Sequence, residues 1–397
     1  MMAEYIPMAA DEPDLPEPFA VQADLEQRLR RRIAQDSPIT FAQFMDAALY
    51  DPEEGFYTRP PIGERGDFVT SPHVSGLFGV LVARQIEEFW DMLGRPERFD
   101  VVEVGAGDGT LARQILDALP AVLLEHTSYI AVERSPGARR ALAEAGIRAV
   151  SSVADSIGDL ANGLTGCVIA NEVLDNLPFH LVRHTAAGLA QVLVSVDRRG
   201  GFVLVEGDAP PDDVAALVPS SLRPGHQAAV SPAALELVDQ AINVIERGYV
   251  FLVDYGVASG QAPPPVHSYR GHRVEADVLT APGSRDITAG VDFDRLVAHA
   301  RSRTPHVWGP VRQRDALLRL GFRELHEHAQ TRQVEAIGAR RGIDAMRIYS
   351  NRNRANQLLA RPGLGEFFVV CFGVGTPSDP APSSVRETGE GELSRRN

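Results

Sequence analysis

The chain contains no lysine, so all 39 of its basic residues are arginine. This absence excludes a Schiff-base lysine, a P-loop lysine on a β/γ-phosphate and a lysine general base, because each of these needs an ammonium group. The 53 acidic residues leave a formal net charge of −14. Nucleic acids and anionic membranes are bound by basic side chains that neutralise phosphates, so the acidic balance argues against both kinds of partner. Small or cationic partners fit this chain better.

Cysteines and long apolar segments are also scarce. The two cysteines, Cys167 and Cys371, lie inside apolar runs and are expected to be buried, not paired in a disulfide or a metal site. The histidines show no H-E-x-x-H spacing, so no metal is expected. No apolar stretch approaches the roughly 18 to 20 residues that span a bilayer. The acidic, proline-containing N-terminus resembles neither a secretory nor a transit signal, which favours a cytoplasmic protein.

Shifts in composition divide the chain into a central part and two ends. Both ends are low in aliphatic residues and rich in Pro, Ser, Gly and Glu, which predicts disordered tails. Apolar residues at helical spacing then predict N-terminal helices on either side of a Gly/Pro-rich loop, a candidate lid. Alternating apolar strands and helical stretches predict an α/β domain whose parallel sheet is covered on both faces. The expected boundaries are 1–20 and 374–397 for the tails, 21–95 for the helices and lid, and 96–373 for the α/β domain, with insertions at about 179–230 and 258–290.

The sharpest motif is VVEVGAGDGT at 101–110, where an apolar strand runs into three alternating glycines and then a helix. Dinucleotide folds prefer G-x-G-x-x-G, whose third glycine serves a pyrophosphate at the helix N-terminus. The tighter E-x-G-x-G-x-G spacing suits a ligand without phosphates, and its acidic residue suits a nearby cation. S-adenosylmethionine has both properties. The alternative is a merely tight strand-to-helix turn. The cofactor-binding residues that this motif predicts are Glu103, Gly105, Gly107 and Gly109.

Polar residues also follow the next strands of the expected sheet. Glu133 ends the second strand, where a carboxylate can accept both hydrogen bonds of a ribose diol. Asn171, Glu172 and Asp175 follow the fourth strand, at the edge where substrates are usually held. Glu172 could orient a guanidinium, whose planar fork matches a carboxylate. The alternative is that Asn171 and Glu172 only cap the following helix. No N-P-P-Y motif is present, which counts against a DNA-base methyltransferase.

Several motifs in order resemble the MidA family of class I methyltransferases dependent on S-adenosylmethionine. The resemblance covers about residues 39–372. Its relatives include a mitochondrial complex I assembly factor that methylates an arginine. The motifs are FMDAALYDPEEGFYT from Phe44, GDFVTSPHVSGLFG at 66–79, VEVGAGDGTL at 102–111, NEVLDNLPFH at 171–180, LVDYG at 252–256, SYRGH at 268–272 and PGSRDITAGVDFDRL at 282–296.

The resemblance implies a fold, a cofactor and site residues. The fold is α/β: a Rossmann-like class I methyltransferase sheet with an added α/β lobe and N-terminal helices. Asn171 and Glu172 match the acidic motif after the fourth strand. The chain departs from the family at His73, where the lid usually has Glu, and at Val173-Leu174, which leaves the methyl acceptor open. The resemblance also predicts that Asp67, Thr70 and Ser71 from the lid bind the cofactor, and it places four residues of a later signature close to the site: Asp286, Thr288, Asp292 and Phe293.

The sequence therefore predicts an S-adenosylmethionine-dependent methyltransferase that acts on a protein arginine. Glu172, Asn171 and Asp175 are its expected catalytic residues. Two alternatives stay open: a scaffold or assembly factor that binds the cofactor without catalysis, and an O- or N-methyltransferase of small molecules. A dinucleotide oxidoreductase is disfavoured by the glycine spacing. A protein substrate is the expected partner, and the sequence does not define the oligomeric state.

Overall fold

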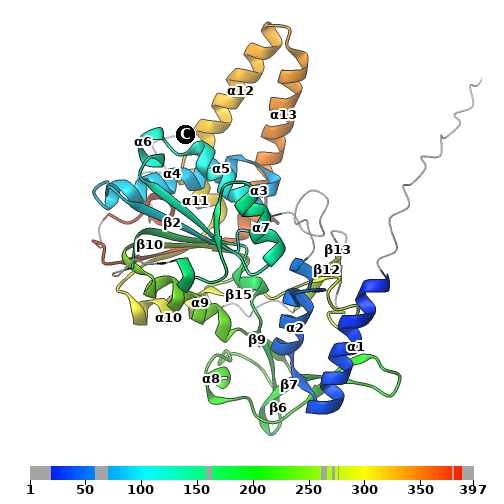
Figure 1. Ribbon diagram of the computed structural model, residues 1–397. Helices are drawn as coiled ribbons and strands as arrows, with labels where there is room; N and C mark the ends of the chain where they lie inside the picture. Colours follow the sequence, from blue (N-terminus) through cyan, green and yellow to red (C-terminus); the bar gives the residue numbers. More distant parts are fainter. Residues whose placement is uncertain are drawn as a thin grey trace, which may run out of the picture.

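A seven-stranded sheet forms the centre of the molecule in the computed structural model, which describes residues 19–58, 70–156, 158, 163–260, 266–270, 273–275, 277–377 and 380–386 (Figure 1). The strand order is β16-β17-β10-β5-β2-β3-β4. The pairs from β10 to β4 are parallel, whereas β17 runs antiparallel to both of its neighbours. The strands are β2 (Phe99–Val104), β3 (Thr127–Val132), β4 (Arg148–Val150), β5 (Leu164–Asn171), β10 (Ile245–Asp254), β16 (His306–Arg312) and β17 (Phe368–Val374).

Helices cover both faces of this sheet and bury two apolar cores. Along β2, Val101 packs into one core, whereas Val102 and Val104 pack into the other, because successive side chains point to opposite faces. Strands buried on both faces explain the near-continuous apolar runs in the sequence. The helices of the first core are α4 (Leu77–Met92), α5 (Thr110–Ala118) and α11 (Gln313–Arg319), and those of the second are α9 (Pro232–Asn243) and α10 (Phe293–Arg303).

A second lobe combines the N-terminal helices with the segment between β5 and β10 (Figure 1). Its five-stranded sheet is antiparallel, and a capping box of Thr40 and Gln43 starts the second helix. Phe41 and Phe179 stack at 5.2 Å between ring centroids in the core of the lobe. The elements are α1 (Phe19–Asp36), α2 (Phe41–Tyr50), β1 (Ile39–Thr40), β6 (His180–Thr185), β7 (Gly188–Val196), β8 (Phe202–Glu206), α8 (Asp212–Ala215) and β9 (Gln227–Val230).

Shorter elements complete the fold. A three-stranded sheet lies in the proline-rich region expected as an insertion at 258–290, and a long helical hairpin follows α11. The elements are α3 (Ser71–Val74), α6 (Ala121–Leu124), α7 (Pro136–Glu144), β11 (Gly256–Val257), β12 (His267–Arg270), β13 (Arg273–Glu275), β14 (Asp286–Thr288), β15 (Val291–Asp292), α12 (Phe322–Gly338) and α13 (Gly342–Asn356).

One boundary expected from the sequence needs correction. Residues 380–386 pack against α4, although the composition predicted a disordered tail from residue 374. Val385 is buried, and the backbone and hydroxyl of Ser383 both donate to Glu88. A single buried valine and a few polar contacts fix this segment, which a compositional argument does not detect. The tail expected at 1–20 lies almost wholly outside the described residues.

Candidate active site

The residues singled out in the sequence meet at one edge of the central sheet. Glu103 lies in β2, Glu133 follows β3, and Asn171 ends β5. Because β2, β3 and β5 are parallel, their carboxyl ends share this edge. Asp254 ends β10, beside β5, at the same edge. Ligands of open α/β sheets bind in this position.

The glycine loop exposes its backbone. Gly105, Gly107 and Gly109 all have positive φ, at 70°, 53° and 76°. A Cβ on Gly105 would lie 2.5 Å from a methyl carbon of Val173, so a side chain there is excluded by space as well as by conformation. The N–H of Gly107 donates to Glu133 Oε2 at 2.9 Å. The loop and the predicted ribose carboxylate therefore form one surface.

Two buried carboxyls flank this loop. Burial raises the pKa of Glu133, even though backbone N–H groups such as that of Ser135, at 2.8 Å, donate to it. Burial also raises the pKa of Glu103 to about 8, opposed by a hydrogen bond from the Tyr129 hydroxyl at 2.7 Å. A neighbouring cation would favour the ionised forms and lower both pKa values. Both carboxyls thus suit a ligand with a diol and a positive charge, as S-adenosylmethionine has.

Glu172 is held in an unusual conformation. It has a φ of 55°, which few residues other than glycine adopt. Its Oε1 accepts hydrogen bonds from the Ser71 N–H at 2.7 Å and from the Asn171 amide at 3.2 Å. Burial raises its pKa to about 7, against the effect of the Ser71 hydrogen bond. Strained backbone of this kind concentrates at functional sites.

Three acceptor atoms around Glu172 lack partners among the described residues. They are Glu172 Oε2, Asn171 Oδ1 and Asp175 Oδ1, and all three are buried. Burial and the nearby Asp254 carboxyl raise the pKa of Asp175 well above its usual range. Buried polar atoms are normally hydrogen-bonded, so three orphan acceptors in one place indicate a missing donor. A cationic group with several N–H donors would satisfy them.

Asp254 stabilises the turn that follows Glu172. No role for Asp254 was predicted from the sequence. Its Oδ2 accepts from the N–H groups of Val173 and Leu174 at 3.0 and 2.7 Å, and its Oδ1 accepts from Tyr255 N–H at 2.7 Å. These bonds cap the short helical turn that carries Asp175 (Leu174–Asn176). The N-cap residue of this turn is Val173, whose side chain makes no capping hydrogen bond. Burial raises the pKa of Asp254 to about 6.

The second lobe contributes a further layer of polar contacts. Tyr57 and Asn176 both donate to Asp286 Oδ1, each at 2.9 Å. The Tyr50 hydroxyl donates to the Asn176 carbonyl at 3.0 Å. Asp286 and Thr288 are both buried in β14. This layer ties the lobe to the acidic turn.

The two remaining residues of the signature at 282–296, Asp292 and Phe293, have structural roles. Asp292 caps α10 by accepting from Arg295 N–H at 3.1 Å. Phe293 is fully buried and packs 5.1 Å from Phe368 between ring centroids. Both hold α10 against the sheet.

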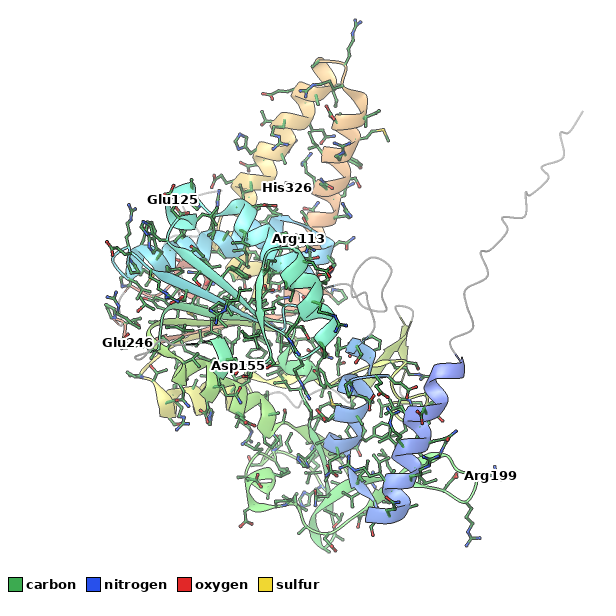
Figure 2. All side chains as sticks on the ribbon, in the orientation of Figure 1. Arg113, Glu125, Asp155, Arg199, Glu246 and His326 are labelled. Atoms are coloured by element: carbon green, nitrogen blue, oxygen red, sulfur yellow. The ribbon has the colours of Figure 1, made fainter. Side chains whose placement is uncertain are left out.

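The short helix α3 closes over the glycine loop. His73 reaches Asp108 Oδ2 through Nε2 at 3.2 Å and Thr70 Oγ1 through Nδ1 at 2.7 Å. Burial would raise the pKa of Asp108, but hydrogen bonds from His73 and Thr110 outweigh it and lower this pKa to about 2. Arg113, labelled in Figure 2, donates to the Asp108 carbonyl from the first turns of α5. Asp67, also named from the sequence, lies outside the described residues, as do the last two residues of the SYRGH motif, 271 and 272.

The described residues contain no group of three or more His, Cys, Asp or Glu side chains placed to hold a metal ion. Among the helices in the described ranges, none combines the length and apolar character that a membrane span requires. Both cysteines are buried and free.

Together, the sheet with one antiparallel strand, the glycine loop after β2 and the carboxylate after β3 define a class I methyltransferase that uses S-adenosylmethionine. A family model described as "putative S-adenosyl-L-methionine-dependent methyltransferase" matches residues 81–311. This match spans more than half of the chain, so the chain belongs to that family, and S-adenosylmethionine is its cofactor.

Relatives and solved structures agree with this assignment. The mitochondrial protein arginine methyltransferase NDUFAF7 homolog of Drosophila melanogaster is 31% identical over 328 residues, which cover 73% of each chain. The human protein arginine methyltransferase NDUFAF7 is 28% identical over 75% of this chain and 73% of its own. A Burkholderia thailandensis protein crystallised with S-adenosylhomocysteine has a TM-score of 0.79 at 28% identity, covering 93% of this chain and 97% of its own. A native crystal structure from the same species gives a TM-score of 0.77 at 27% identity, covering 96% and 99%.

Proposed function

We propose that the protein transfers a methyl group from S-adenosylmethionine to a guanidinium nitrogen of an arginine in a protein substrate. The observation that carries this proposal is the set of three orphan acceptors, Glu172 Oε2, Asn171 Oδ1 and Asp175 Oδ1. A guanidinium has five N–H donors in a fixed plane and can satisfy several acceptors at once. The NDUFAF7 relatives, which are named as protein arginine methyltransferases, support the same acceptor.

The cofactor fits the residues around the glycine loop. The open backbone at Gly105 and Gly107 would hold the cofactor. Glu133 would accept hydrogen bonds from its ribose hydroxyls, and Glu103 would lie near its positive charge. Thr70 and Ser71, at the start of α3, would close the site from the other side. When bound, S-adenosylmethionine supplies an electrophilic methyl group and is left as S-adenosylhomocysteine.

Glu172 orients the acceptor in this proposal. A guanidinium beside Glu172 stabilises the carboxylate form, which brings its pKa below the value of about 7 in the free protein. The ionised Oε2 then accepts an N–H bond and fixes the plane of the guanidinium, while Oε1 stays anchored on Ser71. Burial and the nearby Asp254 carboxyl raise the pKa of Asp175 well above its usual range, which favours its protonated form and limits like-charge repulsion in the pocket.

The proposed methyl transfer needs little acid–base catalysis from the protein. Methyl transfer to a guanidinium adds one positive charge, and the methylated group returns to a singly charged guanidinium by losing one N–H proton to Glu172 or to water. The protein contributes alignment and exclusion of water, because a well-positioned near-attack geometry is worth several kcal/mol. The buried side chains of Asp175 and Asp254 and the buried Oε2 of Glu172 provide this dry environment.

The acceptor can be tested by tracing a labelled methyl group. The purified protein is incubated with S-adenosylmethionine carrying a tritiated methyl group and with proteins from cells that lack its gene. Acid hydrolysis and amino-acid chromatography should then place the tritium in methylarginine. Tritium in the low-mass fraction would contradict the proposal in favour of a small-molecule acceptor. Absence of transfer, with cofactor binding intact by calorimetry, would contradict it in favour of a scaffold without catalysis.

A further inference from the structure

Two buried carboxyls, those of Asp175 and Asp254, meet near Glu172. Asp254 ends β10 and is fully buried, whereas Asp175 lies in the turn after β5 and is 7% exposed. The side chain of Asp175 hydrogen-bonds to that of Asp254. An ionised carboxylate has acceptor atoms only, so a hydrogen bond between two carboxyls requires a proton on one of them. The pair therefore holds a proton.

The backbone around Asp254 favours its ionised form. Its Oδ2 accepts from the N–H groups of Val173, Leu174 and Asp175 at 3.0, 2.7 and 3.4 Å, and its Oδ1 accepts from the Tyr255 N–H at 2.7 Å. Several N–H donors on one carboxylate stabilise its charge. Asp175 Oδ1, by contrast, is buried without a donor among the described residues. The proton of the pair therefore belongs on Asp175.

The surroundings of Asp175 are acidic. Burial raises its pKa well above its usual range, and the charges of Asp254, Asp286 and Glu172 add to this effect. Glu172 and Asp286 have donors of their own: Glu172 accepts from the first N–H of α3 at 2.7 Å, and Asp286 from the Tyr57 hydroxyl at 2.9 Å. Like charges this close together favour a protonated form for one of them. Burial also raises the pKa of three nearby tyrosines and keeps them neutral at pH 7: Tyr50, Tyr57 and Tyr255.

We propose that Asp175 and Asp254 share one proton and that Asp254 is a positioning residue for the acceptor pocket. Asp175 carries the proton and donates it to the Asp254 carboxylate, while Asp175 Oδ1 remains a neutral acceptor. Asp254 in turn fixes the backbone that follows Glu172. Among the three orphan acceptors only Glu172 Oε2 is then charged, which matches the single positive charge of a guanidinium. This match rests on the proposed function, whereas the shared proton does not.

Infrared spectroscopy tests the shared proton, because the C=O group of a protonated acid absorbs at a higher frequency than a carboxylate. At neutral pH the wild type should show an acid band that Asp175→Asn lacks. As the pH is raised, this band should disappear earlier in Asp254→Asn, because loss of a neighbouring negative charge lowers the pKa of Asp175. The matched control is Asp239→Asn, which changes a carboxylate paired with His299 and Arg303 and should titrate like the wild type.

Two results would overturn the shared proton: a wild type without an acid band from Asp175, or a band that titrates identically in the wild type and in Asp254→Asn. Retained calorimetric binding of S-adenosylmethionine shows that a variant is folded. If Asp254→Asn does not fold, the frequency of the wild-type band decides instead. An acid that donates to a carboxylate absorbs at a lower frequency than an acid without hydrogen bonds, so a band at the higher frequency would contradict the bond between Asp175 and Asp254.

Methyl transfer tests the positioning role of Asp254. The assay uses saturating tritiated S-adenosylmethionine and proteins from cells that lack the gene. Asp254→Asn should slow the formation of methylarginine about tenfold or more, because the turn loses a charged acceptor. Asp239→Asn should match the wild type, and equal rates in the two variants would show that Asp254 does not position the acceptor pocket. Absence of transfer by the wild type would instead contradict the proposed function, and the infrared result would stand.

Discussion

At the scale of single residues, Glu172 combines a left-handed backbone with a buried carboxylate oxygen that has no partner among the described residues. Glu172→Gln keeps the shape and the contact with Ser71 but removes the charge. Hydrogen bonds to charged groups are worth about 1.5–3 kcal/mol, so methyl transfer should fall roughly 10- to 100-fold or more. Calorimetric affinity for S-adenosylmethionine should not change. Glu125→Gln, on the surface, is the matched control (Figure 2), and equal rates in the two variants would rule out this role.

The raised pKa of Glu172 predicts a pH dependence. Its pKa rises from 4.5 to about 7 through burial, so the carboxylate form in the free protein is lost as the pH falls through about 7. Because kcat/KM reports ionisations of the free enzyme, it should decline about tenfold per pH unit below that value. Glu172→Gln should give a flat profile in the same range. A wild-type profile that is flat down to pH 5 would count against the ionised carboxylate.

Some site residues could be predicted from the sequence, whereas others needed the fold. Glu133 and Glu172 directly follow apolar strands, and Glu103 and the three glycines lie in or just after another, so the local pattern alone predicts them as candidates. Asp254, Tyr57 and Asp286 act through contacts across 80 to 229 positions of the chain. No local signal reveals such pairs. The left-handed conformation of Glu172 was equally invisible, because it results from the packing around the turn that follows it.

At the scale of elements, α3 links the lid to the glycine loop through His73 and Asp108. His73→Ala removes this link together with the contact to Thr70. A partly exposed hydrogen bond is worth about 0.5–1.5 kcal/mol, so affinity for S-adenosylmethionine should weaken roughly 2- to 12-fold. Calorimetry measures this directly, with His226→Ala in the exposed loop of the second lobe as control. If His73→Ala binds the cofactor as tightly as the wild type, the link has no part in cofactor binding.

The parallel strands were the elements best predicted from sequence, because both of their faces are buried and their apolar runs are unbroken. The strand β16 and the helices α12 and α13 were harder to recognise. All seven residues of β16 are only partly buried, as suits the edge of a sheet, and the run contains Pro310. The hairpin has apolar residues on the exposed side, so its pattern does not match a helix packed against its own core.

At the scale of the whole molecule, the two lobes are held together beside the acidic turn. Asn176 of the acidic turn donates to Asp286 of the second lobe. Tyr57 donates to the same carboxylate oxygen, and burial raises the pKa of the Tyr57 hydroxyl well above the usual value. Tyr57→Phe removes one donor from a buried carboxylate and should lower the free energy of unfolding by about 1–3 kcal/mol. Urea denaturation measures this loss against Tyr349→Phe, which changes an exposed tyrosine. Equal stability of the two variants would show that the lobes are joined by other contacts.

The most direct test of the account is a crystal structure of the protein with S-adenosylhomocysteine. We expect both ribose hydroxyls to contact Glu133 and the backbone between Gly105 and Gly109 to follow the ligand. The sulfur of the ligand should face the pocket of Glu172 and Asp175. A ligand bound elsewhere, or one whose sulfur faces away from Glu172 and Asp175, would contradict the central claim that this sheet edge is the site of methyl transfer.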